Sequence, residues 1–165
     1  MKKMLAILCL ALCAMTALTA CAGKDGAEDP KCSMTMSELA EDIMGKVQFA
    51  MTMPVDMTNE DESAYITEST GLDPAWMADF SININMIVSA DNLWLAEGNT
   101  AEDAAKIAEA FEKEKQSVIQ SFEQYLPEPL ERAKNGQVVT KGRYVMLIIS
   151  ADNDTAIAAF EDAIQ

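Results

Sequence analysis

The sequence predicts an α+β fold in which a mainly antiparallel, four-stranded sheet packs with helices. Apolar and polar residues alternate from Phe80 to Val88, which is typical of a strand with one buried face. Two turn signals, residues 90–92 and Lys141-Gly142, separate strand patterns and so indicate two hairpins. Other stretches repeat apolar residues at helical spacing. The expected order is helix, helix, strand, strand, helix, strand, strand, helix, forming one domain over residues 35–165.

Two helices are expected before the first hairpin. The first begins with the capping box Thr35-x-x-Glu38 and runs to about Ala50, because residues 39, 40, 43, 44, 47 and 50 place apolar side chains on one face. Thr58 or Asn59 is expected to cap a short second helix that ends at Gly71. This helix would hold Tyr65 and Ile66 on its inner side.

The first hairpin is expected to bury one set of alternating side chains and to expose the other. The buried set would be Phe80, Ile82, Ile84, Met86 and Val88. Leu93 to Glu97 would form the returning strand. Asn99-x-x-Glu102 then resembles a cap for a long helix whose apolar stripe runs from Ala104 to Leu126 before Pro127 and Pro129 stop it.

The last part of the chain predicts a second hairpin and a terminal helix. Residues 137–140 and 143–150 would be its two strands. Tyr144 to Ile149 is a continuous apolar run, which favours an inner strand covered on both faces. Asp152 or Asn153 would cap the final helix, which places Ile157, Phe160 and Ile164 inward.

The amino-terminal segment predicts export and lipid anchoring. Lys2 and Lys3 precede an uncharged apolar run from Met4, which closes with Leu18-Thr19-Ala20-Cys21. This tetrad resembles the lipobox of bacterial lipoproteins, so residues 1–20 are expected to be a signal peptide, cleaved between Ala20 and Cys21. Cys21 would then carry a diacylglycerol of palmitate type and, as an option, an N-acyl chain. An uncleaved membrane helix and cleavage without lipid are the alternatives.

Composition limits the partners of the expected mature chain. After residues 1–20 are removed, 145 residues carry 10 Lys and Arg against 27 Asp and Glu, a net side-chain charge of −17. Nucleic acid is not an expected partner, because phosphate binding needs clustered basic residues. Residues 21–34 are expected to form the lipidated cysteine and a flexible tether. The expected location is the outer face of the bacterial cytoplasmic membrane, with membrane contact through the lipid alone.

Several short motifs together resemble a known family. They are the leading amphipathic helix, Ser89-Ala90-Asp91-Asn92-Leu93 continuing to Glu97, Tyr125-Leu126-Pro127-Glu128, and Gly142-x-Tyr144-Val145 followed by Ile149-Ser150. Over residues 36–164 the chain is similar to small lipoproteins of Gram-positive, clostridial-type bacteria that are known only as a domain of unknown function. The resemblance implies the location and the fold, and it supplies no catalytic residue.

The residue types present argue against most enzymatic chemistry. The chain has no histidine, so Ser-His and Cys-His nucleophile pairs and imidazole metal sites are excluded. Cys32 is the only thiol expected to remain after processing and lipidation. No catalytic residue, metal site or cofactor is therefore expected. A carboxylate-based enzyme remains an alternative, since paired acids can transfer protons.

A non-enzymatic binding or accessory module of the cell envelope is the expected function, with another envelope protein or a small ligand as the partner. Its candidate contact residues are Met51, Met53, Met57 and Trp76, with Trp94 as a further aromatic, because Met and aromatic residues favour contact surfaces. Six methionines fall between Met34 and Met57. Thioethers select Cu(I), so a Cu(I)-binding surface protein is a second alternative.

Overall fold

The computed structural model describes residues 29–124 and 126–165. It shows a five-stranded antiparallel sheet with the strand order β1-β2-β3-β5-β4. The strands are β1 (Thr52–Pro54), β2 (Met77–Asn85), β3 (Asn92–Gly98), β4 (Gln137–Lys141) and β5 (Tyr144–Ile149). The α+β class and the two expected hairpins, β2 with β3 and β4 with β5, are confirmed.

The expectation of four strands is wrong by one strand, β1, which lies between the first two helices and pairs with β2. It has three residues and ends in Pro54, so neither residue alternation nor strand composition could reveal it. The observed order is α1, β1, α2, η1, β2, β3, α3, α4, β4, β5, α5.

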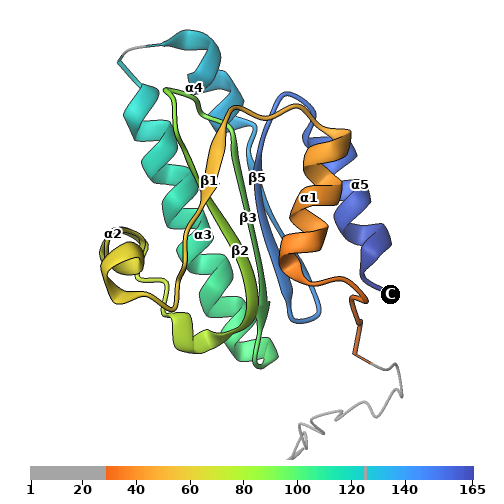
Figure 1. Ribbon diagram of the computed structural model, residues 1–165. Coiled ribbons are helices and arrows are strands. Elements are labelled where there is room, and N and C mark those ends of the chain that lie inside the picture. Colours follow the sequence, from red (N-terminus) through yellow and green to blue (C-terminus); the bar gives the residue numbers. More distant parts are fainter. Residues whose placement is uncertain (1–28, 125) are drawn as a thin grey trace, which may run out of the picture.

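Helices cover both faces of the sheet (Figure 1). One face packs against α3 (Ala101–Phe122), and the other packs against α1 (Met36–Lys46) and α5 (Asn153–Ala163). On the α3 side lie also α2 (Glu60–Thr70), the short 3-10 helix η1 (Pro74–Trp76) and α4 (Pro127–Lys134). No helix among the described residues is long and apolar enough to cross a membrane.

Two separate cores result from this three-layer arrangement. The first core lies between the sheet and α3 and centres on Trp94 and Phe111, whose rings meet edge to face with centroids 5.5 Å apart. The second core lies under α1 and α5 and includes Leu95, Met146 and Phe160. All six residues of β5 are buried, as expected for an inner strand.

The structure shows which of the expected residues cap the helices. Both halves of the Thr35–Glu38 capping box are present, Asn59 caps α2, and Asp152 caps α5, as expected. The cap of α3 is Thr100, whose hydroxyl accepts from the Asp103 N–H at 3.1 Å, so the expected Asn99 cap is wrong. The Asn99 amide instead donates to the Ala75 carbonyl at 2.7 Å.

Helix lengths differ from expectation where tertiary contacts intervene. α1 ends at Lys46 instead of about Ala50, because the chain turns there towards β1. α3 ends at Phe122, and Pro127 begins α4 instead of only ending α3. Tyr65 was expected inside α2 but is 72% exposed, since only one side of α2 meets the core.

The expected buried face of β2 is only partly observed. Ile82 is buried, while Met86 and Val88 follow the end of the strand and are exposed. Ser81 and Asn83, which were expected on an open face, are buried because α1 packs over β2 and β3.

The two described ends of the chain are joined at the edge of the domain. Lys31 and Gln165 exchange two backbone hydrogen bonds of 2.7 and 3.0 Å, and Cys32 forms an isolated bridge with Ile164. The Cys32 N–H also donates to the Tyr144 hydroxyl at 3.1 Å. The carboxyl-terminal part of the expected tether, from Lys31 onwards, is therefore bonded to the domain. Residues 1–28, which contain the expected signal peptide, Ala20 and Cys21, lie outside the described residues, as does Tyr125.

Candidate functional site

Five large apolar side chains are exposed at one end of the sheet, and we call them the end patch. They come from the start of β1 and from the loop after β2. Their exposed fractions are 67% for Met51, 45% for Met53, 56% for Met86, 57% for Ile87 and 77% for Val88. Single exposed apolar residues are normal on protein surfaces, whereas a group of this kind marks a contact site more often.

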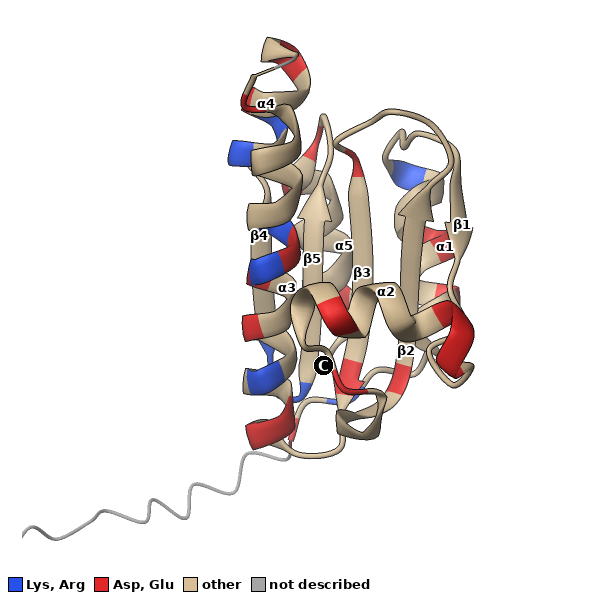
Figure 2. Ribbon diagram, turned by 90° about the vertical axis from the view of Figure 1, so that its left-hand side faces the viewer, with Lys and Arg blue, Asp and Glu red and all other residues tan. Residues whose placement is uncertain are grey.

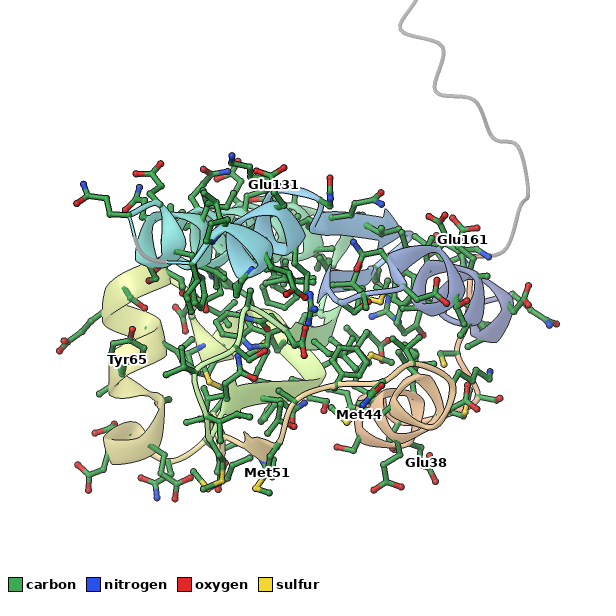
Figure 3. The ribbon with its side chains drawn as sticks, turned by 90° about the horizontal axis from the view of Figure 1, so that it is seen from above. Glu38, Met44, Met51, Tyr65, Glu131 and Glu161 are labelled. Atoms are coloured by element: carbon green, nitrogen blue, oxygen red, sulfur yellow. The ribbon has the colours of Figure 1, made fainter. Side chains whose placement is uncertain are left out.

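Backbone pairing joins the two halves of the end patch. The Met86 N–H donates to the Met51 carbonyl at 2.9 Å, which continues the β1–β2 ladder by one residue pair. Met53 lies opposite Ile84, and Ile84 packs against the first core. Because residues two apart on a strand share a face, Met51 and Met53 lie on this same side of the sheet. Figure 3 shows Met51 at the periphery of the molecule.

The end patch is exposed because the elements that cover this face of the sheet do not reach as far as Met51. Val55, two residues beyond Met53, belongs to the first core and is 8% exposed, so exposure rises along β1 from Val55 through Met53 to Met51. The strand therefore extends past the elements that cover it. Residues 47–55 and 80–90 contain no charged side chain, although 24% of the chain is charged.

The outer edge of β1 is mostly closed to a further strand. Met51 bonds to Met86, and Val55 bonds to Ile82, through backbone hydrogen bonds. The backbone groups of Thr52 and Pro54 therefore point away from β2. Pro54 has no N–H to offer. Further along, the Ala50 N–H donates to Asp91 at 2.9 Å and the Asp56 N–H to Glu62 at 3.3 Å. This edge therefore favours contact through side chains over addition of a strand.

A buried ion pair supports the loop that carries the end patch. Asp91 has a side chain 7% exposed and accepts from Arg132 of α4 at 2.7 Å. This hydrogen bond raises the pKa of Arg132. The Asn85 amide donates to the carbonyls of Ser89 and Asp91 at 3.0 and 2.6 Å. Residues 86–90 are thus held at both ends, and the apolar side chains project from a fixed loop.

Acidic side chains gather where α2 begins, beyond the end of β1 that is far from Met51. The first turn of α2 contains Glu60, Asp61 and Glu62, and Asp56 precedes it. The Thr58 hydroxyl donates to Asp56 at 2.6 Å and lowers the pKa of that carboxyl, which keeps it ionised. Figure 2 shows acidic residues on α2, on α1 behind it and near the start of β2, which contains Asp79, whereas β1 carries no charge.

The structure brings together only part of the expected contact set. Met51 and Met53 lie in the end patch. Met57 is 1% exposed and belongs to the first core, so it is not available to a partner. Trp76 is half-buried in η1, with the Lys106 ammonium 5.7 Å from its ring centroid, and Trp94 is buried. Met86, Ile87 and Val88 were missed because the alternating pattern placed Met86 and Val88 in the core.

A second group of polar side chains lines a hollow beside α2. A hollow of about 600 Å³ lies between α2 and η1, and the acids Glu60, Glu68 and Asp73 contribute to its lining. One oxygen of Asp73 already caps η1 through the Ala75 N–H. Among the described residues, no group of three or more His, Cys, Asp or Glu side chains is arranged to hold a metal ion.

Comparison with protein families places all five strands of the sheet in a known domain. Residues 51–150 match the model described as "Domain of unknown function (DUF4358)". The matched segment begins at Met51 and continues through β5, so it contains the whole end patch, whereas α1 and α5 lie outside it. No curated protein and no solved structure matches the chain.

Proposed function

This chain belongs to the family of the domain of unknown function DUF4358, and we propose that it is a lipid-anchored binding module of the bacterial cell envelope. In this proposal the end patch contacts another envelope protein. The observation that carries the proposal is the group of exposed apolar side chains on a backbone fixed by Asp91 and Arg132.

The anchoring part of the proposal is supported by the amino-terminal sequence. Leu18-Thr19-Ala20-Cys21 after an apolar run fits a lipoprotein signal, with Cys21 as the lipidated residue. Two acyl chains would hold the protein firmly, because each buried methylene contributes about 0.8 kcal/mol. Since Lys31 is bonded to Gln165, residues 22–30 would form the free tether. Nine extended residues span at most about 30 Å.

The position of the tether supports a protein, not the anchoring membrane, as the partner. Cys32 lies beside Tyr144, which pairs with Glu97 near the end of β3, whereas the end patch adjoins the start of β3. Cys32 and the end patch are therefore at opposite ends of the sheet (Figure 1). Strands rise about 3.3 Å per residue, so β3 alone separates the two ends by about 20 Å. An anchored domain would present its end patch away from the lipid.

Charge supports a partner surface that is apolar at its centre and basic at its rim. The segments that carry the end patch, residues 47–55 and 80–90, contain no charged side chain, and the net charge of the chain is −15. Two copies of this chain would repel each other at such a charge. Complementary basic residues would instead speed association and add specificity.

The test is site-specific photo-crosslinking in membranes of the producing bacterium, with the photoreactive group at position 87. We expect one envelope protein to be crosslinked, and we expect the substitutions Met51→Asp and Met86→Asp together to lower the yield at least about tenfold, because they place two charges in the apolar contact. Tyr65→Asp is the matched control, since Tyr65 is equally exposed on α2 outside the end patch.

A second control tests the lipid anchor separately from the protein contact. The variant Cys21→Ser is expected to leave the membrane fraction and to lose the crosslink while it keeps the circular dichroism spectrum of the folded domain. Crosslinks to lipid, crosslinks to a second copy, or an equal loss with Tyr65→Asp would each refute the proposed contact. An unmodified Cys21 in mass spectra of the membrane-bound protein would refute the anchor.

A further inference from the structure

Three of the five residues of the end patch are methionines from two different strands. Met51 and Met86 are joined by a backbone hydrogen bond of 2.9 Å, and Met53 follows Met51 by two residues. From this arrangement we propose that Met51, Met53 and Met86 together form a binding site for Cu(I), a function separate from protein contact.

The sheet register brings the three side chains close enough to share one ion. Directly opposed residues on antiparallel strands have Cβ atoms about 5.5 Å apart, and residues two apart on one strand are about 7 Å apart. Met51 and Met53 share the face to which Val55 and Ile84 contribute, and the backbone bond between Met86 and Met51 continues this register by one pair. Methionine has three rotatable side-chain bonds, so three sulfur atoms can turn inward to one point.

The ligand chemistry selects a soft cation. Thioethers bind Cu(I) in preference to hard ions such as Mg²⁺ or Ca²⁺, which need oxygen ligands. The immediate surroundings are uncharged over residues 47–55 and 80–90, so no carboxylate of these segments competes for the ion. The acidic chain as a whole attracts cations, which favours the approach of Cu(I). The ion binds without electron transfer.

The structure separates this trio from the other methionines of the amino-terminal half. Met36 and Met57 are at most 1% exposed, and Met34 and Met44 pack against the second core. Figure 3 shows Met44, which belongs to α1, away from Met51. Met86, which is distant in sequence, joins the site instead. The proposed site therefore differs from the methionine cluster that the sequence alone presents.

The test is an anaerobic Cu(I) titration against a competing chelator. The mature chain from Ala22 contains every described helix and strand and both cores, and Cys32→Ser removes the competing thiol. We expect one Cu(I) per chain, with an X-ray absorption spectrum that shows sulfur neighbours. Each of Met51→Leu, Met53→Leu and Met86→Leu should weaken binding at least about tenfold, as expected when a metal ligand is lost.

Met57→Leu is the matched control, because Met57 is close in sequence but buried in the first core. It should leave the affinity for Cu(I) unchanged. Leu keeps the apolar volume of Met, so the three Leu variants should fold normally and keep the protein crosslink at position 87. Unchanged Cu(I) affinity in a variant with all three Leu substitutions, or an equal loss in Met57→Leu, would overturn the Cu(I) site and leave the proposed protein contact untouched.

Discussion

Glu114 occupies a position on α3 where the helical pattern places an apolar side chain. It lies between Phe111 and Val118, three residues after the first and four before the second, on the side of α3 that packs against the sheet. Burial raises the pKa of the Glu114 carboxyl, and its oxygen accepts from the Asn92 amide at 3.3 Å. The buried side-chain oxygen of Asn92 has no partner among the described residues. This polar pair is therefore only half satisfied, which costs stability.

Glu114→Gln is expected to stabilise the fold at neutral pH. Because the folded-state pKa is raised, the ionised carboxylate lowers stability once the pH exceeds the ordinary value of about 4.3, and the loss is complete above the raised pKa. The neutral amide avoids this loss and can donate to Asn92. A gain of about 0.5 kcal/mol at pH 7 corresponds to a Tm rise of about 1 to 2 °C.

Thermal unfolding at pH 7 and pH 4 measures this effect. The difference in Tm between the variant and the original chain should shrink towards pH 4, where the original carboxyl is protonated. Glu109→Gln serves as the control on the exposed side of the same helix and should change little. A gain that is equal at both pH values would argue against ionisation as the cause.

At the scale of elements, the junction of β3 and α3 depends on the absence of a side chain at Gly98. A Cβ atom there would lie 2.7 Å from the Ala104 nitrogen and 2.9 Å from the Thr100 oxygen. Both are backbone atoms of the first turn of α3 and its cap, so they cannot move away by a change of side-chain rotamer. The close approach lets α3 begin directly after the strand and lie along the sheet.

Gly98→Ala should therefore destabilise the protein, whereas Gly45→Ala should stabilise it. The first change forces backbone atoms apart at an expected cost of about 2 kcal/mol, or about 4 to 8 °C in Tm. Gly45 lies in α1 with nothing within 4 Å of the added atom, and Ala favours a helix by about 0.5 to 1 kcal/mol. Chemical denaturation of both variants tests the pair. Equal and small effects would contradict the assigned packing.

At the scale of the whole molecule, the bonds between Lys31 and Gln165 close the chain into a unit with both ends on one side. Ile164 is fully buried in the second core and pairs with Cys32. Figure 1 shows the carboxyl terminus beside the point where the amino-terminal segment leaves the domain. In the proposed anchored state, this closure would determine which end of the sheet faces the membrane.

Deletion of Ile164 and Gln165 should release the segment that precedes α1. The Cys32 amide, which donates to the Tyr144 hydroxyl, should lose protection from hydrogen exchange, and the half-buried Cys32 thiol should react faster with a thiol reagent. Amides of β5 should stay protected, because helices still cover both faces of that strand. Gln165→Ala is the control, since it keeps both backbone bonds. Unchanged exchange at Cys32 in the deletion variant would contradict the closure.

Local signals in the sequence predicted much of the fold and little of the candidate site. The Thr35 cap was correctly predicted, and the caps of α2 and α5, Asn59 and Asp152, are each one of the two residues that the sequence offered, because a cap depends on residues within one turn. Met51 and Met53 were predicted as contact residues on composition alone, and both are exposed in the structure. The involvement of Met86 depends on its pairing with Met51 across 35 positions of sequence, which no local pattern encodes.

The sequence by itself determined the α+β class, the two hairpins and the buried inner strand β5, because periodicity and turn residues act over short distances. It also carries the expected lipidation signal at Cys21, which lies outside the described residues. Only the tertiary structure decided that β1 completes a five-stranded sheet, that Met57 is buried while Met86 is exposed, and that the end patch lies opposite the tether. These features depend on strand order and on where the helical layers end, and both arise from packing between segments distant in the chain.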